Sequence, residues 1–291
     1  MFGLALILFA VFGSDGKNDE FKPQDEFKLE SWIPIKIGPI DMSINKAVLY
    51  LALAAIATIL VMTWIARKMS EQSADHRPNR IQTALESAYD LTNNTITKSN
   101  LSDTRMAAKW FAFIATLFFF IWFSNMIGYI PLPTSAHTVD IFGVAVPTLA
   151  LYAATANLSV PLVLTLMVWF AYHVQGIRSQ GFVTYLKSWV PAGVSGPAAV
   201  PIFFIEVISQ FVRIISLSVR LFANILAGHL LILFMAGGLV VLLGLPALGV
   251  FTLPMAIAFF LFEVGLVATL QAFIFATLTA IYIGGAVTAD H

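Results

Sequence analysis

Apart from tyrosine, five ionisable side chains lie within two long apolar runs of this 291-residue chain: Glu206, Arg213, Arg220, His229 and Glu263. The first three recur every seven residues, which puts them on one face of a helix with about 20° of drift per step. His229 follows Arg220 by nine residues and falls on roughly the opposite side. Because ionisable groups are costly in hydrocarbon, they normally face a protein interior or a wet cavity and mark an ion path.

These residue types suit proton transfer. A histidine and a partly desolvated glutamate both gain and lose protons near neutral pH, as a relay requires. Arginine stays protonated in proteins, so Arg220 cannot carry protons, but a fixed cation between two wet pockets would block proton leakage. It would also lower the pKa of a mobile carboxylate brought against it. Beyond Glu206 this chain offers no obvious carboxylate for that role, so we expect another subunit to supply it.

Polar side chains accompany these groups: Ser216 and Asn224 lie near the stripe of the first run at intervals of three and four residues, and Gln271 lies on the second run. Gln271 follows Glu263 by about two helical turns. For Arg213, an ion pair with Glu206 two turns away is favoured over a transport role.

The amino-acid composition indicates the environment of these ionisable groups. The chain is 59% hydrophobic and 11% charged, whereas soluble domains are roughly 25% charged. Its mean hydropathy is +0.86. These values exclude an ordinary soluble protein and indicate an all-α polytopic membrane protein with about five membrane-embedded helices. The net charge of zero points to no nucleic-acid partner, and the absence of cysteine excludes disulfides, thiol catalysis and thiolate metal sites.

Charges between the apolar blocks divide the chain into spans and connections. We expect an apolar start and polar outer arm at 1–45, a first span at 46–66, an inner segment at 67–105, two spans within 106–173 (about 106–130 and 147–172), an inner loop at 174–200 and a long helical hairpin at 201–288. Lys and Arg follow the first span and are missing from the loop at 131–146, which indicates the inner and outer sides. The N-terminus is thus expected outside and the C-terminus inside.

Residues 81–98 have the pattern of an amphipathic helix. Apolar side chains from Ile81 to Ile96 form one stripe, with Glu86 and Asp90 opposite. We expect this helix to lie on the membrane surface, and a loop helix packed on its neighbours is the alternative.

The two apolar runs at 201–243 and 249–284 are longer than a bilayer requires. A helix of the first length would extend roughly 64 Å, against a hydrocarbon core of about 30 Å. Either each run contains two short spans or the two form a hairpin of steeply tilted helices. We favour the hairpin because no turn signal interrupts the first run.

The expected polarity assigns a depth to each ionisable group. Glu206 lies toward the inner side, Arg220 near the middle, and His229 and Glu263 in the outer half. The sequence therefore predicts an inward-opening pocket at Glu206 and Arg213 and an outward-opening pocket at His229 and Glu263, kept apart by Arg220.

Other aromatic and histidine residues are expected at the membrane interface. Tyr129 and Tyr172 fall at ends of the expected spans, where an aromatic belt explains them without a function. His173 ends an apolar run and is interpreted in the same way.

Four segments of the chain resemble subunit a of the F-type ATP synthases. The most specific is Ser216-Leu-Ser-Val-Arg-Leu-Phe-Ala-Asn-Ile-Leu-Ala-Gly-His229, which is similar to the family signature around its essential arginine. Three others support it: Leu270-Gln-Ala-Phe-Ile-Phe-Ala-Thr-Leu-Thr-Ala-Ile-Tyr282, Thr155-Ala-Asn-Leu-Ser159 and Asn125-Met-Ile-Gly-Tyr-Ile-Pro131. The resemblance covers about residues 100–288.

The resemblance implies that Arg220 faces a ring of c subunits and separates two half-channels. It implies that Asn224 and Gln271 are polar neighbours of Arg220, that His229 and Glu263 form a pair, and that Glu206 belongs to the inner half-channel. Ser216 lies in the same signature. The implied fold has a surface-lying amphipathic helix and two long tilted helices, and the implied partners are the c-ring, the peripheral-stalk b subunits and the rest of the complex.

The resulting hypothesis is a non-catalytic, proton-translocating stator subunit without cofactor or metal. No Gly-rich phosphate loop is present, so ATP chemistry would belong to other subunits. A self-contained proton-coupled transporter is the alternative, although no internal repeat is evident; a purely structural anchor is a third reading. We expect a bacterial plasma membrane, with a mitochondrial inner membrane as the alternative. Residues 1–12 fit either a signal sequence or a buried anchor.

Overall fold

The structure is a computed structural model, and it describes residues 27–29, 31–37, 40–41, 43–71, 80–101, 103–134, 138–141, 144–147, 151–191, 194, 196–238 and 248–287. The expectations for residues 1–12 and for most of the outer arm lie outside the described residues. So do residues 244–247, which belong to the sequence Gly-Leu-Pro-Ala-Leu-Gly at 244–249 that separates the two long runs.

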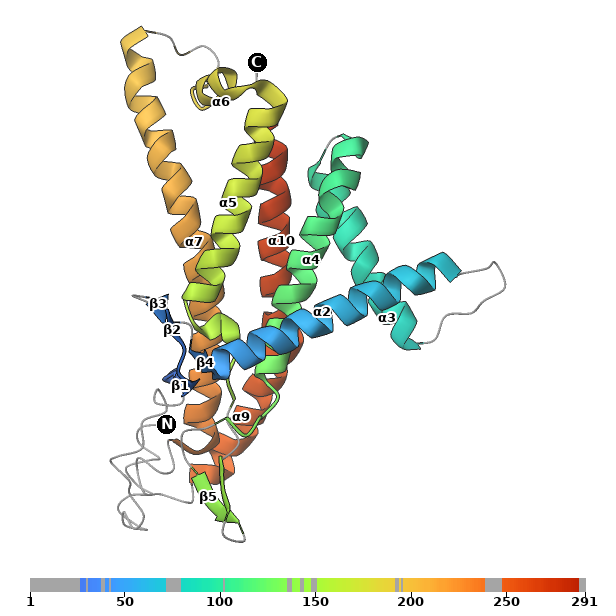
Figure 1. The fold of residues 1–291 in the computed structure, drawn as a ribbon, viewed down its shortest axis with the longest axis vertical. Helices are drawn as coiled ribbons and strands as arrows, with labels where there is room; N and C mark the ends of the chain where they lie inside the picture. The colour runs from blue at the N-terminus through green and yellow to red at the C-terminus, as the bar shows by residue number, and fades with distance from the viewer. Residues whose placement is uncertain are drawn as a thin grey trace. The chain divides into compact units, whose positions relative to one another are not determined.

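Five helices are long and apolar enough to cross a membrane: Lys46–Lys68, Thr104–Gly128, Ser159–Gln180, Gly196–Ala236 and Gly249–Gly285. They correspond to α2 (Lys46–Glu71), α4 (Thr104–Gly128), α5 (Ser159–Gln180), α7 (Ala199–Leu233) with the π-helix η5 (Phe234–Gly238), and α9 (Gly249–Phe262), η7 (Glu263–Val267) and α10 (Ala268–Gly285) in succession. Figure 1 shows them as the long coiled ribbons. The prediction of an all-α polytopic fold with five membrane helices is confirmed.

Each of the two longest apolar runs forms one helix. The first continues from α7 into η5 without an interrupting turn, and the second continues from α9 through η7 into α10. The segment α9 packs back against η5. The hairpin is therefore the correct choice over two pairs of short spans, and at 41 residues the first helix is roughly 60 Å long.

The start of the third span was predicted wrongly. We expected it near residue 147, but α5 begins at Ser159 and ends at Gln180, eight residues beyond the expected end at 172. Pro147 instead ends strand β6 (Val144–Pro147), which pairs with β5 (Thr138–Ile141), and the mostly apolar residues 151–158 contain only the short helix η3 (Ala154–Ala156) before α5 begins. Hydropathy alone does not distinguish such a segment from the first turns of a helix. Pro161 is tolerated in the first turn of α5 because the N–H that it lacks would have no helical partner there.

Short hairpins accompany the helices and were not expected from an all-α pattern. In the outer arm, β1 (Ser31–Ile33) pairs with β4 (Ile44–Asn45), and β2 (Lys36–Ile37) pairs with β3 (Ile40–Asp41). All these pairs are antiparallel two-stranded sheets.

The chain divides into two compact units. Unit 1 contains Met1–Leu53, Ser124–Asn157 and Ala223–Thr269, and unit 2 contains Ala54–Phe123, Leu158–Phe222 and Leu270–His291. In unit 1, one core cluster joins Ala47, Tyr50, Tyr152 and Ala154, and another joins Tyr129, Ile232 and Ala268.

In unit 2 the amphipathic segment is helical, as predicted. It comprises α3 (Arg80–Asp90) and the π-helix η2 (Leu91–Lys98). Thr92 and Ile96 on its apolar stripe are fully buried, and the ring of Tyr89 meets Phe111 edge-on at 4.9 Å. The helix thus packs on its neighbours along this stripe, and its position on a membrane surface stays a prediction.

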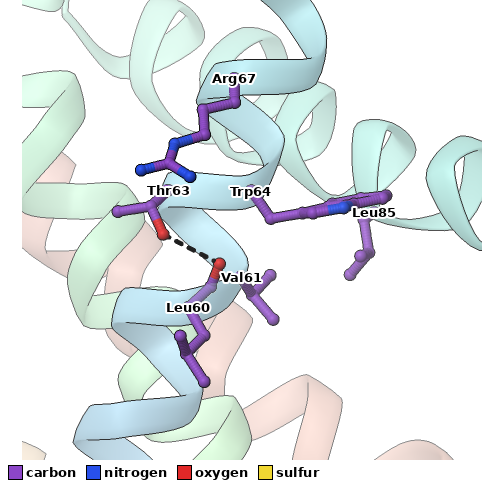
Figure 2. A pocket seen from close by; sticks show the side chains of 6 residues that line it. All are labelled: Leu60, Val61, Thr63, Trp64, Arg67 and Leu85. Atoms are coloured by element: carbon purple, nitrogen blue, oxygen red, sulfur yellow. Dashed lines mark hydrogen bonds between the residues drawn. The ribbon is translucent and has the colours of Figure 1, made fainter.

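A groove of about 450 Å³ lies between α2 and α3 in the same unit. Figure 2 shows its wall of Leu60, Val61, Thr63, Trp64, Arg67 and Leu85. The Thr63 hydroxyl donates to backbone carbonyls of its own helix, 2.7 Å from Ile59 and 3.0 Å from Leu60. The wall facing the groove is consequently apolar, apart from the exposed guanidinium of Arg67.

Candidate functional site

Arg220 lies on an exposed face of α7. Ser216 and Asn224, one turn before and one turn after it, are exposed as well. Side chains four residues apart share a helix face, so the three form one polar row. Among the residues that the structure describes, none forms a hydrogen bond or ion pair with the Arg220 guanidinium. A permanent cation that is exposed within an apolar helix is suited to meet a charge from outside this chain.

His229 lies on the opposite side of α7 and is fully buried in unit 1. Its Nδ1 is 3.0 Å from the carbonyl oxygen of Ile225, and its Nε2 is 3.2 Å from the carbonyl oxygen of Gly128. A neutral imidazole donates from only one nitrogen, whereas an imidazolium donates from both. Both contacts can be hydrogen bonds at the same time only when each ring nitrogen carries a proton. The surroundings of His229 can therefore accommodate the imidazolium form.

Tyr129 joins His229 to Glu263. Its ring stacks on the imidazole with 4.4 Å between centroids, and its hydroxyl donates to Glu263 Oε2 at 3.0 Å. Glu263 is 8% exposed, and its carboxylate packs against Gly228, where an added Cβ would collide with it. The structure therefore brings His229 and Glu263 into one cluster around Tyr129, which we call the outer cluster.

Two of the supporting motifs meet next to this cluster. The Thr155 hydroxyl donates to Asn125 Oδ1 at 2.7 Å, and the Asn125 amide donates to the carbonyl oxygen of Ala268 at 3.5 Å. All three residues are buried. These bonds tie the end of α4 and the segment before α5 to the helix that contains Glu263.

The π-helix η7 sets the rotation between Glu263 and Gln271. Glu263 begins η7, and Gln271 lies eight residues further on in α10, where it is 5% exposed. A single π turn accommodates one extra residue, so these eight residues turn through about the angle of seven in an α-helix. Seven residues bring side chains back to one face within about 20°. Gln271 and Glu263 thus occupy similar faces of one helix despite the eight-residue spacing.

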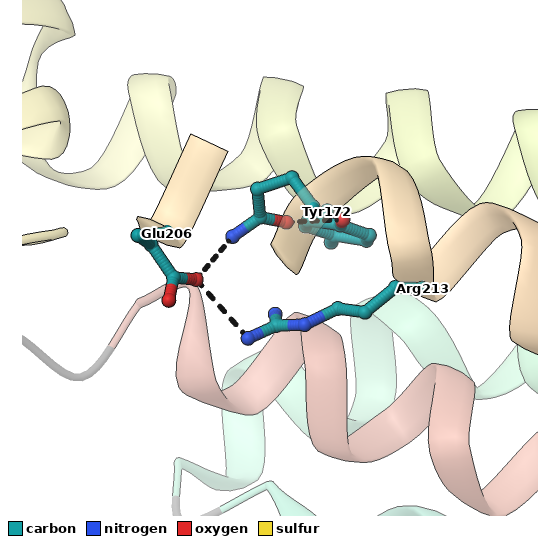
Figure 3. A network of polar contacts seen from close by, with 4 residues as sticks. Tyr172, Glu206 and Arg213 are labelled. Carbon is teal, nitrogen blue, oxygen red and sulfur yellow. Dashed lines mark hydrogen bonds and ion pairs between the residues drawn. The ribbon is translucent and has the colours of Figure 1, made fainter. Parts of the chain in front are cut away.

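A second polar cluster lies in unit 2 around Glu206. Gln210 Nε2 donates to Glu206 Oε1 at 2.7 Å, and Arg213 Nη2 donates to the same oxygen at 3.1 Å. The Tyr172 hydroxyl donates to Gln210 Oε1 at 2.6 Å. Figure 3 shows this chain of contacts from Tyr172 to Arg213. We call these four residues the inner cluster, and they line a cavity of about 500 Å³.

Arg213 contacts Glu206, as the seven-residue spacing predicts. It forms an ion pair with Glu206 at 3.1 Å, and its guanidinium lies 5.4 Å from the centre of the Tyr282 ring. The Arg213 and Glu206 side chains are 35% and 28% exposed. The predicted pair is therefore present, although solvent screens part of its attraction.

Tyr129 and Tyr172 were expected only as membrane-interface residues. Their hydrogen bonds in the two clusters were not predicted. For Tyr172 the cause is the misplaced span: ending at 172 puts this tyrosine at the membrane interface, whereas in the observed α5 it lies eight residues before the end. The sequence could have indicated a role for Tyr129, because this residue belongs to the motif at 125–131 that resembles the family.

His173 packs among aromatic rings. Its ring centre is 4.2 Å from that of Trp169 and 4.4 Å from that of Tyr172, and Tyr185 and Trp189 are each 5.8 Å away. Both ring nitrogens are buried, and neither has a hydrogen-bond partner among the described residues. These ring contacts account for the orientation of His173, and its position at a membrane interface stays a prediction.

Within the described part of the chain, no group of three or more His, Asp or Glu side chains could hold a metal.

Comparison with known proteins decides the family. The model of the family described as ATP synthase A chain matches residues 48–284. The chain belongs to this family.

Individual relatives agree with this assignment. The ATP synthase subunit a of Rubrobacter xylanophilus is 36% identical over 265 residues, covering 90% of this chain and 92% of the relative. The subunits a of Brucella ovis and Brucella canis are each 33% identical over 273 residues, covering 92% of this chain and 98% of the relative. The family predicted from the motifs is confirmed, and nothing in these comparisons supports a self-contained transporter.

Proposed function

We propose that this chain is the stationary, proton-translocating subunit of an F-type ATP synthase, which carries no ATP chemistry of its own. Membership of the ATP synthase A chain family supports this function, as do the five apolar helices. The transmembrane potential supplies about 2.3 kcal/mol per elementary charge per 100 mV. The subunit would allow this energy to be released only through rotation of an adjacent ring.

The order of groups along α7 is the observation that carries the proposal. Glu206 precedes Arg220 by fourteen residues, and His229 follows it by nine. At 1.5 Å per residue these separations correspond to about 21 Å and 13.5 Å along the helix. Arg220 is exposed between a carboxylate and a histidine that each belong to a polar cluster. In the proposal, the inner and outer clusters each serve one half-channel.

Arg220 separates the two half-channels. Being permanently charged, it repels protons on their way between the clusters and stabilises the ionised form of a carboxylate carried past it by the ring. The ring carboxylate must bind a proton again before it moves back into the hydrocarbon of the membrane. One proton therefore enters through one half-channel for each proton that leaves through the other. Ser216, Asn224 and Gln271 provide uncharged polar contacts beside this path.

The outer cluster exchanges protons through Glu263 and His229. The Tyr129 hydroxyl bonds to Glu263 and its ring stacks on His229, so it holds both groups in place. The carbonyl oxygens around His229 can accept both of its N–H groups. A proton on either group is therefore hydrogen-bonded inside the protein.

The partners and orientation follow from the same assignment. The exposed row on α7 would face the c-ring, and the peripheral-stalk b subunits and the remaining subunits would complete the complex. The N-terminus would lie outside and the C-terminus in the cytoplasm of a bacterial plasma membrane. The distribution of Lys and Arg supports this orientation, and the relatives named above are bacterial.

Replacement of Arg220 tests the proposal. Inverted vesicles containing the assembled complex are compared for ATP-driven proton pumping and passive proton leak, using Arg220→Ala and the wild type. We expect pumping to be lost and leak to increase in a normally assembled complex. Arg178→Ala, which removes an exposed arginine near the end of α5, is the matched control. Normal pumping by Arg220→Ala would overturn the proposed mechanism.

A further inference from the structure

Gln210 is a buried amide in the middle of the inner cluster, and its position calls for an explanation. It is 4% exposed and lies on α7 one turn after Glu206. A buried amide costs free energy unless its hydrogen-bonding groups are paired. Gln210 meets this requirement with contacts on both ends, to a tyrosine on α5 and to a glutamate on its own helix.

The two contacts fix which end of the amide faces the carboxylate. Because the Tyr172 hydroxyl donates to Gln210 Oε1 at 2.6 Å, the amide nitrogen is turned toward Glu206 and donates to it at 2.7 Å. An amide has an acceptor and a donor end of nearly the same shape, so a free glutamine could also turn its oxygen toward the carboxylate. Tyr172 itself is held by ring contacts with His173 at 4.4 Å and Tyr282 at 5.8 Å.

The described residues hold the carboxylate of Glu206 through one oxygen only. Both of its donors, Gln210 Nε2 and Arg213 Nη2, converge on Oε1. Oε2 accepts no hydrogen bond from any residue that the structure describes, and in Figure 3 it points away from both donors. The side chain lines the cavity of about 500 Å³ and is 28% exposed, so water can reach it.

We propose that Tyr172 and Gln210 are positioning residues, which fix the Glu206 carboxylate so that Oε2 is the atom that exchanges protons with water in the inner cavity. This inference rests on the proposed function of the inner cluster. A hydronium ion in the cavity transfers its proton to Oε2, leaving water and a neutral carboxyl group. The proton then passes from Oε2 to a water molecule on the side of the ring, which restores the carboxylate.

Arg213 cannot replace this positioning. It holds the same oxygen from a longer and more flexible side chain that is 35% exposed. Gln210 is buried and bonded at both ends, so it has one orientation. Without the Gln210 amide, Glu206 would keep its ion pair with Arg213, but its carboxylate would be free to rotate. Proton capture by Glu206 would then be slower at low proton concentration.

The test measures initial rates of ATP-driven pumping in inverted vesicles as a function of the pH of the medium, which is the inner side. Gln210→Leu removes the amide, Gln210→Asn keeps it on a side chain too short to bridge, and Tyr172→Phe removes only the donor that orients it. For each we expect the proton concentration giving half the maximal rate to rise by about threefold to tenfold, the effect of one lost hydrogen bond. The maximal rate at saturating proton concentration should be retained.

Gln175→Leu is the matched control. Gln175 is also a buried glutamine of unit 2, and its Oε1 accepts from Lys109 Nζ at 2.7 Å and from Trp110 Nε1 at 3.3 Å, away from Glu206. Its variant should keep the wild-type dependence on inner pH. The inference is overturned if Tyr172→Phe and both Gln210 variants keep the wild-type dependence, or if Gln175→Leu shifts it equally. Arg220→Ala, measured in the same vesicles, tests the proposed function separately.

Discussion

The outer and inner clusters hold their carboxylates in different ways. Glu263 in the outer cluster is 8% exposed and bonds to an uncharged hydroxyl, with Gly228 giving it room. Glu206 in the inner cluster has a side chain that is 28% exposed and bonds to a guanidinium and an amide. A buried carboxylate without a cation depends on the exact fit of its few neighbours, whereas a partly hydrated one paired with a cation tolerates their loss better. The comparison predicts that substitutions in the outer cluster have the larger effects.

The largest effect is expected for Glu263→Gln. It keeps the shape of the side chain and one oxygen that can accept from the Tyr129 hydroxyl, and it removes the ability to take up and release a proton. We expect ATP-driven pumping to fall by on the order of a hundredfold, in the range for loss of an acid–base group. The measurement is fluorescence quenching in inverted vesicles, normalised to assembled complex. Glu86→Gln on α3, where the carboxylate accepts from Gln82 at 2.7 Å, should leave pumping unchanged. Equal effects of the two substitutions would contradict the role of Glu263.

An intermediate effect is expected for Tyr129→Phe. The phenyl ring still stacks on His229, but the hydrogen bond to Glu263 at 3.0 Å is lost. One such bond corresponds to about a threefold to tenfold change, so pumping should slow by this factor and depend more steeply on the pH inside the vesicles. The control is Tyr152→Phe, because Tyr152 is also a buried tyrosine of unit 1, and the bond to Glu263 comes from Tyr129 instead. A wild-type rate in Tyr129→Phe would show that stacking alone suffices.

The smallest effect is expected for Arg213→Gln. The ion pair that it removes is about one-third exposed and therefore screened, and Glu206 keeps its bond to Gln210. Pumping should decline by less than about threefold. Arg178→Gln serves as the control for loss of one positive charge in the same unit. If pumping declined as much as in Glu263→Gln, the charge of the cation, and not burial of the carboxylate, would determine how sensitive each cluster is to substitution.

Sequence periodicity predicted the parts of the structure that depend on helical geometry. The seven-residue spacing from Glu206 to Arg213 correctly indicated an ion pair, and the nine residues from Arg220 to His229 correctly indicated opposite faces of α7. These relations hold within one helix, so they need no knowledge of how the chain folds back.

The residues that were missed depend on contacts between distant segments. Tyr129 lies 134 positions before Glu263, and Tyr172 lies 38 positions before Gln210. Helical spacing says nothing about such pairs, and both tyrosines had a sufficient explanation as membrane-interface residues. The start of α5 was missed because the mostly apolar residues 151–158 precede the helix, and hydropathy does not distinguish them from its first turns.

The π-helix η7 makes the second long helix tolerant of a change in length. Since the wide turn takes up one residue between Glu263 and Gln271, a deletion within 264–267 can be accommodated by closing it into ordinary α-helix. The remainder of α10 would keep its orientation about the helix axis, and the buried faces of Gln271 and Thr279 would not need to repack. Relatives with one residue fewer at this point can therefore share the same interior, and a sequence alignment that forbids a gap inside a membrane helix would misplace every residue on one side of it.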